Sequence, residues 1–260
     1  MINILKNIPF LFFLFKKIIF YYKKIIFFVI GSEYFDRQIS EINATFEYLS
    51  DKKTFLKKTF PPFNGQKIRI KIVNKILSKR LINEIFETGA YHGSTTQFLT
   101  KYKIPIKACE ISTANYFITK DRLKKYKNVY IENCHSYEFL KKTLLKNNKI
   151  YFIYLDAHKP DAPSPLLEEL EVIFENLNNF IILIDDFLVP HDQGYGYDSV
   201  NGSILKISYI KKFLKKDHIS FFFPKTHSSN ESGFKRGSIY ICKGNKCRSL
   251  CKSINELIQY

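Results

Sequence analysis

Short apolar runs alternate with helical patterns between residues 82 and 242, and this alternation constrains the fold more than any other feature of the chain. Strands joined by helical crossovers pair in parallel, so the pattern predicts an α/β fold whose mostly parallel sheet is covered by helices on both faces. The seven expected strands are residues 82–87, 106–110, 129–132, 150–156, 180–185, 218–223 and 237–242. The helical patterns lie near residues 94–102, 113–126, 136–146, 165–176 and 203–215. Residues 224–236 have no helical pattern, which predicts an antiparallel hairpin for the last two strands.

The length and composition fit one globular domain with an N-terminal appendage. The chain has 260 residues, of which 45% are hydrophobic, and a core of that size needs no disulfide scaffold. We expect an amphipathic helix in residues 1–31, a connecting helical region in 32–64 and the sheet domain in 65–260. The number of cysteines, five, is odd, and their spacing lacks the C-x2-C pair of a zinc site. This favours a reducing, cytoplasmic compartment.

Residues 9–30 read PFLFFLFKKIIFYYKKIIFFVI, which is the most apolar segment of the chain. The longest uncharged run near it has nine residues, whereas a membrane-spanning helix needs about 20. On a helix, the five lysines of residues 1–31 fall within an arc of about 120°. This predicts a helix that lies in the interface of the cytoplasmic membrane face. The alternative is that the apolar face packs on the protein's own domain or on a second subunit, so a homo-oligomer stays open.

The formal net charge of +17 is typical of proteins that bind nucleic acid or an anionic membrane. Lys, Ile, Asn, Phe and Tyr are abundant while Trp is absent and Met occurs once, which indicates an AT-rich genome. Part of the lysine excess therefore reflects codon usage. Because no RNA-binding motif accompanies the charge, a nucleic-acid partner is not favoured.

Glycine and polar residues follow the first three predicted strands, where a parallel sheet binds its ligand. The first strand ends in ETGAYHGST, in which Gly89 and Gly93 permit a tight turn and a close approach of the backbone to a ligand. Their spacing is not the G-x-G-x-x-G of a dinucleotide fold, which counts against a polyol or sugar dehydrogenase. Glu110 ends the second strand, where a carboxylate can accept hydrogen bonds from both hydroxyls of a ribose. The third strand is followed by His135 and Ser136.

Together with KACEIS, HSYEFL, YLDAH and LIDDF, these residues resemble class I S-adenosylmethionine-dependent methyltransferases over about residues 64–243. Within that superfamily the chain is most similar to small-molecule and sugar O-methyltransferases of the macrocin O-methyltransferase kind. The resemblance implies a Rossmann-like seven-stranded sheet of order 3-2-1-4-5-7-6 with the last strand antiparallel.

The same resemblance implies S-adenosylmethionine as cofactor, with Glu110 at its ribose and with His135 and Ser136 beside its adenine. His135 departs from the Asp or Asn that often precedes this Ser. The full set of expected cofactor-binding residues is Glu87, Thr88, Gly89, Ala90, Tyr91, Gly93, Ser94, Glu110, His135, Ser136 and Asp156.

Carboxylates end the next two strands, with Asp156 on one strand and Asp185 and Asp186 on the other. Neighbouring strands lie about 5 Å apart, so the three groups repel one another unless one is protonated or a cation intervenes. Such ligands suit Mg²⁺ or another divalent ion, which would orient substrate hydroxyls and lower the pKa of the attacked one. The resemblance implies the same metal site. The alternative is that Asp156 and Asp185 orient cofactor and loop without a metal, while Asp186 caps the segment that follows.

Two histidines lie in the loops just past these acids. Either His158 or His191 could take the proton of a substrate hydroxyl, so Asp156, His158 and His191 form the expected catalytic set. An ordinary surface role is the alternative for each histidine. Residues 192–198, DQGYGYD, favour a mobile lid with aromatic surfaces for a sugar ring, or an ordinary loop.

The leading hypothesis is therefore an O-methyltransferase that acts on a hydroxyl of a sugar or glycan precursor near the membrane, with a divalent metal as an optional assistant. Two alternatives are kept. An RNA methyltransferase is the one that the charge favours, and strong, salt-sensitive RNA binding would indicate it. A catalytically inactive membrane-bound scaffold of the same fold is the other, and the converging carboxylates count against it.

Overall fold

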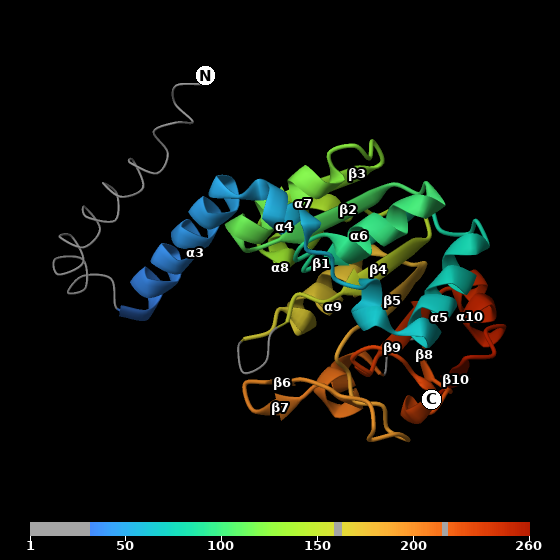
Figure 1. Cartoon of the computed structure of the whole chain (residues 1–260). Coiled ribbons are helices and arrows are strands. Elements are labelled where there is room, and N and C mark those ends of the chain that lie inside the picture. Colours follow the sequence, from blue (N-terminus) through green and yellow to red (C-terminus); the bar gives the residue numbers. More distant parts are fainter. Residues whose placement is uncertain (1–31, 159–162, 215–217) are drawn as a thin grey trace.

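The computed structural model describes residues 32–158, 163–214 and 218–260, so the helix predicted for residues 1–31 lies outside the described residues (Figure 1). A central sheet of eight strands has the order β10-β8-β9-β5-β4-β1-β2-β3. Its strands are β1 (Glu84–Thr88), β2 (Ile106–Glu110), β3 (Val129–Asn133), β4 (Tyr151–Leu155), β5 (Phe180–Ile184), β8 (Ile219–Pro224), β9 (Ile239–Lys243) and β10 (Leu257–Gln259).

The sheet order confirms the predicted fold. With β8 and β9 as the sixth and seventh strands, the order is 3-2-1-4-5-7-6, and β9 runs antiparallel to both of its neighbours. The number of strands was predicted wrongly, because β10 adds an eighth strand antiparallel to β8 at the edge. A separate two-stranded ribbon is formed by β6 (Ser199–Val200) and β7 (Ser203–Ile204).

Helices cover both faces of the sheet (Figure 1). The α-helices are α3 (Ser32–Ser50), α4 (Lys52–Lys57), α5 (Lys67–Ser78), α6 (Ser94–Leu99), α7 (Thr113–Leu123), α8 (Ser136–Thr143), α9 (Leu166–Asn176) and α10 (Asn245–Lys252). Short 3-10 helices are η1 (Pro62–Gly65), η2 (Thr100–Tyr102), η3 (Ile207–Phe213) and η4 (Ser228–Asn230). Apolar residues of α8, α9 and η3 pack on one face of the sheet, and those of α5 and α10 pack on the other.

Strands β4 and β5 are apolar throughout because both of their faces are covered. Successive side chains of β4 alternate between the two cores: Ile153 and Leu155 belong to one, whereas Phe152 and Tyr154 belong to the other. The two strands are buried along their whole length. They therefore form a rigid base for the polar residues that follow them.

The segment 203–215 differs from its predicted α-helix, because it begins as β7 and continues as the 3-10 helix η3. Its apolar residues Ile204, Ile207, Ile210 and Phe213 recur every third position, which matches three residues per turn better than 3.6. Helices α5 and α10 were not predicted.

The connecting region is tied to the sheet domain at several points. Tyr48 of α3 donates a hydrogen bond to Asp121 of α7 at 2.6 Å. Glu41 of α3 accepts hydrogen bonds from Ser112 Oγ at 3.0 Å and from Thr113 N at 3.2 Å. Within the described part of the chain, no helix combines the length and apolar character that crossing a bilayer requires.

Candidate active site

The turn after β1 brings the backbone unusually close to the end of β4. Gly89 has a φ of +75°, and a Cβ at this position would lie 2.2 Å from the carbonyl oxygen of Asp156. Tyr91 adopts a left-handed φ of 49°, which aims its N–H at Glu110 Oε2 at 2.7 Å. A non-glycine residue with such a φ is held there by its surroundings, and strain of this kind is concentrated at functional sites.

Glu110 stands at the end of β2, beside a cavity at the carboxyl edge of the sheet. Its second oxygen accepts the N–H of Ser112 at 2.8 Å, so two backbone bonds fix the carboxylate. Each carboxylate oxygen can accept more than one hydrogen bond. The cavity has about 520 Å³ and is called the larger cavity below. The predicted residues that line it are Gly89, Tyr91, Glu110, His135, Ser136, Asp156 and His158.

A smaller cavity of about 180 Å³ adjoins the larger one, and both are lined by Gly89, Tyr91 and Asp156. Of these two cavities, the smaller one alone is lined by Glu87, Ala90 and Ser94. The predicted cofactor residues Thr88 and Gly93 line neither of these two cavities. Thr88 is buried within β1, and Gly93 serves the turn into α6 with a φ of +73°. The two cavities thus meet at the ends of β1 and β4.

Glu87 is a buried acid on the wall of the smaller cavity. Burial and, to a smaller extent, the charge of Glu110 raise its pKa to about 8, although the nearby hydroxyl of Thr96 acts in the opposite direction. Its Oε2 has no hydrogen-bond partner among the described residues. A cationic group in the cavity would satisfy this oxygen and favour the ionised form.

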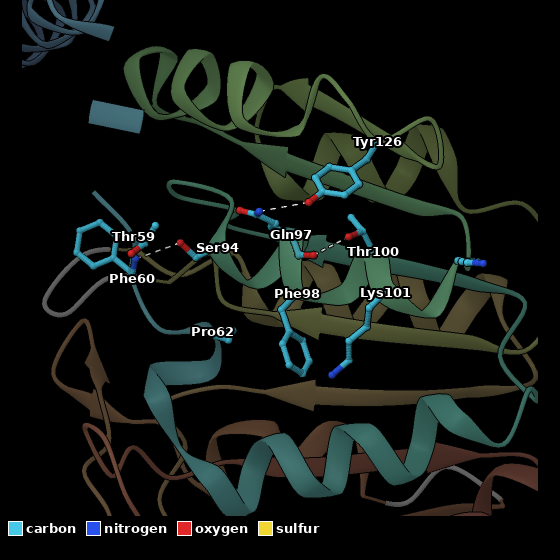
Figure 2. Close-up of a pocket in the computed structure, with 10 residues that line it drawn as sticks. Thr59, Phe60, Pro62, Ser94, Gln97, Phe98, Thr100, Lys101 and Tyr126 are labelled. Carbon is cyan, nitrogen blue, oxygen red and sulfur yellow. Dashed lines mark hydrogen bonds between the residues drawn. The ribbon is translucent and has the colours of Figure 1, made fainter. Parts of the chain in front are cut away.

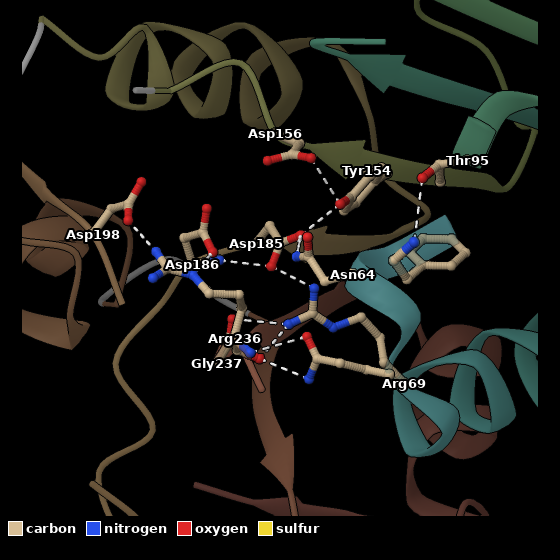
Figure 3. Close-up of polar contacts among 12 residues, drawn as sticks. Asn64, Arg69, Thr95, Tyr154, Asp156, Asp185, Asp186, Asp198, Arg236 and Gly237 are labelled. Carbon is tan, nitrogen blue, oxygen red and sulfur yellow. Dashed lines mark hydrogen bonds and ion pairs between the residues drawn. The ribbon is translucent and has the colours of Figure 1, made fainter. Parts of the chain in front are cut away.

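Asp185 does not face the cavities, contrary to its predicted place among metal ligands. It is fully buried and forms an ion pair with Arg69 of α5 (Figure 3). Its Oδ2 accepts hydrogen bonds from Asn64 Nδ2 at 3.1 Å and from Tyr154 Oη at 2.6 Å, and its Oδ1 accepts the N–H of Asp186 at 2.8 Å. Both oxygens are therefore engaged within the fold.

Asp186 turns away from the Asp185–Arg69 pair and belongs to a second set of charged residues. Its left-handed φ of 51° directs Oδ1 toward the guanidinium of Arg236, which also forms an ion pair with Asp198 (Figure 3). Its Oδ2 lies 3.7 Å from His158 Nε2. The repulsion predicted between the carboxylates is thus relieved mainly by two arginines that the sequence did not single out.

The structure groups His158, rather than Asp185, with Asp156 and Asp186. Ligand atoms of these three residues all lie within 4.8 Å of one another. Burial lowers the pKa of His158, but the carboxylates of Asp186 and Asp156 overcome this effect and raise it to about 9. Its Nε2 is buried without a hydrogen-bond partner among the described residues. A divalent cation fits this set of two carboxylates and one imidazole.

Tyr154 connects the two sets of charges. Its hydroxyl lies 2.9 Å from Asp156 Oδ2 and 2.6 Å from Asp185 Oδ2. Burial raises the pKa of Asp156 well above its ordinary value, and the charge of Asp185 adds to that rise. Asp156, Asp186 and His158 therefore influence one another's protonation.

His191 does not join the predicted catalytic set. Its Nε2 lies 3.0 Å from the carbonyl oxygen of Pro224 at the end of β8, and its ring meets Phe223 edge-on. The prediction that residues 192–198 form an aromatic lid is also wrong for Tyr195. That ring is 1% exposed, and its hydroxyl donates to the carbonyl oxygen of Thr226 at 2.9 Å.

Segments outside the predicted motifs complete the site. Residues 60–64, which were expected to be a connector, place Phe60, Pro61 and Asn64 in the smaller cavity, and α3 places Arg37 in the larger one. One signal could have identified Arg69 and Arg236. Only six of the 41 basic residues are arginines, and arginine is the residue suited to buried ion pairs.

A search of protein families finds no match for this chain, and a search of curated proteins finds none either. Solved structures with a similar course of the chain include an O-methyltransferase from Bacillus cereus in complex with SAH, which is 14% identical with a TM-score of 0.48. The match covers 68% of this chain and 80% of that chain. The O-methyltransferase TomG from Streptomyces achromogenes, in complex with SAM, is 12% identical with a TM-score of 0.48, and 78% and 89% of the two chains are covered.

An rRNA methylase from Streptococcus thermophilus is 15% identical with a TM-score of 0.45, and the match covers 67% of this chain and 95% of that chain. At identities this low, the chemistry has to be inferred from the residues of the site.

Proposed function

We propose that the protein is an S-adenosylmethionine-dependent O-methyltransferase. The observation that carries the proposal is the meeting of two cavities at Gly89, Tyr91 and Asp156, with Glu110 beside the larger one. A cofactor and an acceptor can occupy adjoining spaces and face each other at this junction. The position also fits the rule that parallel sheets bind ligands outside their carboxyl ends.

The larger cavity suits the nucleoside part of the cofactor. Glu110 is fixed by two backbone N–H groups and can accept the ribose hydroxyls, while His135 and Ser136 line the part of the cavity assigned to adenine. The methionine part would pass the turn at Gly89, whose backbone packs directly against that of Asp156. The unpartnered oxygen of Glu87 and the carboxylate of Asp156 suit the positive charges of this cofactor.

The transfer itself is a direct displacement. The acceptor hydroxyl oxygen forms a bond to the methyl carbon, the carbon–sulfur bond breaks with its electron pair going to sulfur, and the hydroxyl proton leaves. His158 is already protonated at neutral pH because its pKa is about 9, so it is a poor acceptor by itself. We assign the proton to the coupled network of Asp156 and His158.

We also propose that Asp156, His158 and Asp186 hold a divalent cation such as Mg²⁺, which would displace the proton from His158, because only a neutral imidazole binds a metal. The buried, unpartnered Nε2 of His158 supports this assignment. The two carboxylates suit Mg²⁺ or Mn²⁺, whereas the imidazole favours a transition metal. A bound cation would lower the pKa of the acceptor hydroxyl. Asp185 is left out of this set, because Arg69 and Tyr154 engage it.

The acceptor that we propose is a sugar or glycan precursor. Exposed aromatic rings of Phe60, Tyr91 and Phe234 surround the smaller cavity, where they can lie against the apolar face of a sugar ring. These rings replace the aromatic lid that was expected from residues 192–198. With the segment 9–30 on the cytoplasmic membrane face, the site would work beside membrane-bound precursors.

Calorimetric titration with S-adenosylhomocysteine, the demethylated product, tests the function. We expect micromolar binding by the wild type and an affinity at least about 10-fold lower for Glu110→Gln, because a charged acceptor of ribose hydroxyls is lost. Glu171→Gln, at an exposed position of α9, is the matched control and should bind like the wild type. No binding by the wild type, with or without Mg²⁺, would contradict the proposal and favour the inactive scaffold.

A further inference from the structure

A third space of about 610 Å³ lies along α6, outside the two cavities described above (Figure 2). We call it the α6 groove. Its walls are Thr59, Phe60 and Pro62 on one side, the helices α6 and η2, and Tyr126 beyond the end of α7. Phe60 and Ser94 line both the α6 groove and the smaller cavity. A chain-like ligand could therefore extend from the smaller cavity past Phe60 into the groove.

The α6 groove carries positive charge without a compensating acid. Its ten lining residues include Lys101 and Lys103 but neither Asp nor Glu. Lys125 adds a third cation, since its Nζ lies 5.2 Å from the centre of the Tyr126 ring. Across residues 32–158, 163–214 and 218–260, none of these three lysines forms an ion pair with a carboxylate. An anionic group would complement this charge.

Lys101 is held in place rather than extended into solvent. Its Nζ lies 3.0 Å from Asn74 Oδ1 and 3.6 Å from the centre of the Phe98 ring. The ammonium has three N–H donors, so two remain after the bond to Asn74. Gln97 Nε2 lies 3.3 Å from Tyr126 Oη on the opposite side of α6 from Lys101 (Figure 2). The groove thus combines one ordered ammonium with amide and hydroxyl groups, which suits a sugar with an acidic substituent.

We propose that the α6 groove is a remote acceptor subsite that binds a negatively charged unit, carrying a carboxylate or a phosphate, of an extended glycan. This inference rests on the proposed function and names its substrate class. Single-stranded RNA is the less favoured occupant, because successive bases need several free aromatic faces, and Phe60 is the only exposed ring among the residues that line the groove. The ammonium of Lys101 covers a face of Phe98, and the rings of Phe63 and Tyr102 pack at steep angles to it.

The test compares binding of defined oligosaccharides to the full chain by calorimetry. The probes are tetragalacturonate, maltotetraose carrying one phosphate, and neutral maltotetraose. The variant is Lys101→Met with Lys103→Met, which removes both charges and keeps apolar bulk. The control is Lys146→Met, an exposed lysine beyond α8. Each sample is also titrated with S-adenosylhomocysteine, which reports on the cofactor site independently of the groove.

We expect at least one anionic probe to bind more tightly than maltotetraose, and the double variant to lose about 5- to 30-fold of that affinity. The preferred anionic probe identifies carboxylate or phosphate as the recognised group. Binding of S-adenosylhomocysteine should stay unchanged in the double variant. Failure of the wild type to bind it would contradict the proposed function, whereas the probe affinities test the subsite. Equal binding of the anionic and neutral probes, or an unaffected double variant, would overturn the subsite. Tighter binding of an oligouridylate, lost in the same variant, would overturn it in favour of RNA.

Discussion

Replacing Arg69 with Met should strongly destabilise the protein, because Arg69 is the cation that neutralises the buried carboxylate of Asp185. The side chains are 2% and 0% exposed, so no solvent replaces the lost charge. Removing one partner of a buried pair costs about 3–5 kcal/mol of the free energy of unfolding. The guanidinium also donates to the carbonyl oxygens of Arg236 and Gly237, which adds about 1 kcal/mol. Domains of this kind have about 5–15 kcal/mol in total.

Urea-induced unfolding, followed by far-ultraviolet circular dichroism, measures the effect. The double variant Arg69→Met with Asp185→Asn removes both charges. Its loss of unfolding free energy should be smaller than the summed losses of the two single variants by at least about 2 kcal/mol. Arg80→Met, at an exposed position, should change stability by less than about 0.5 kcal/mol. A cost below about 1 kcal/mol for Arg69→Met, or strict additivity, would refute the reasoning.

Three further predictions concern the site. In urea unfolding, Gly89→Ala should lower the free energy of unfolding by at least about 2 kcal/mol more than Gly202→Ala does. Both glycines have a positive φ, but only a Cβ at Gly89 would meet backbone, 2.2 Å from Asp156 O. Equal losses would contradict this. Glu87 binds a proton in the folded state between its ordinary pKa of 4.5 and about 8, so its contribution to stability falls as pH rises through that window. Glu87→Gln should remove this dependence on pH. The melting temperature of the variant minus that of the wild type should therefore rise from pH 5 to pH 8, and a constant difference would refute the assignment. Mn²⁺ titrated into the protein should give an electron paramagnetic resonance signal of bound ion that His158→Ala weakens at least about 10-fold; equal binding by both proteins would contradict the metal assignment.

A fifth prediction concerns the N-terminal segment. The full chain should sediment with anionic liposomes, and deletion of residues 1–31 should abolish this, because the lysine stripe and the apolar face are then gone. Unchanged sedimentation after the deletion would contradict the membrane proposal.

Local patterns were enough to predict most of the sheet. The strand at residues 106–110 has the predicted bounds, and those predicted at 180–185 and 150–156 are shorter by one and two residues. These strands could be predicted because a continuous apolar run marks a strand that is buried on both faces. The pattern failed at α5, whose sequence KIRIKIVNKILS alternates like a strand at its start although it folds as a helix. Packing of this helix on the sheet decided the outcome.

The acids of the site could be predicted, but their partners could not. Asp185 and Arg69 are 116 positions apart, and no local pattern links them. Asp185 and Asp186 are adjacent in sequence, yet the left-handed backbone at Asp186 sends their carboxylates to different partners. The direction of a side chain beyond the end of a strand depends on such backbone angles, which spacing alone does not determine.

A crystal structure with bound S-adenosylhomocysteine tests the central claim most directly. We predict that the ribose hydroxyls lie within hydrogen-bonding distance of Glu110 and that the sulfur lies where the two cavities meet, beside Gly89 and Asp156. The acceptor side of that sulfur should open into the smaller cavity, toward Glu87 and Phe60. Density for the ligand elsewhere, or none at saturating concentration, would contradict the assignment of this edge of the sheet to methyl transfer.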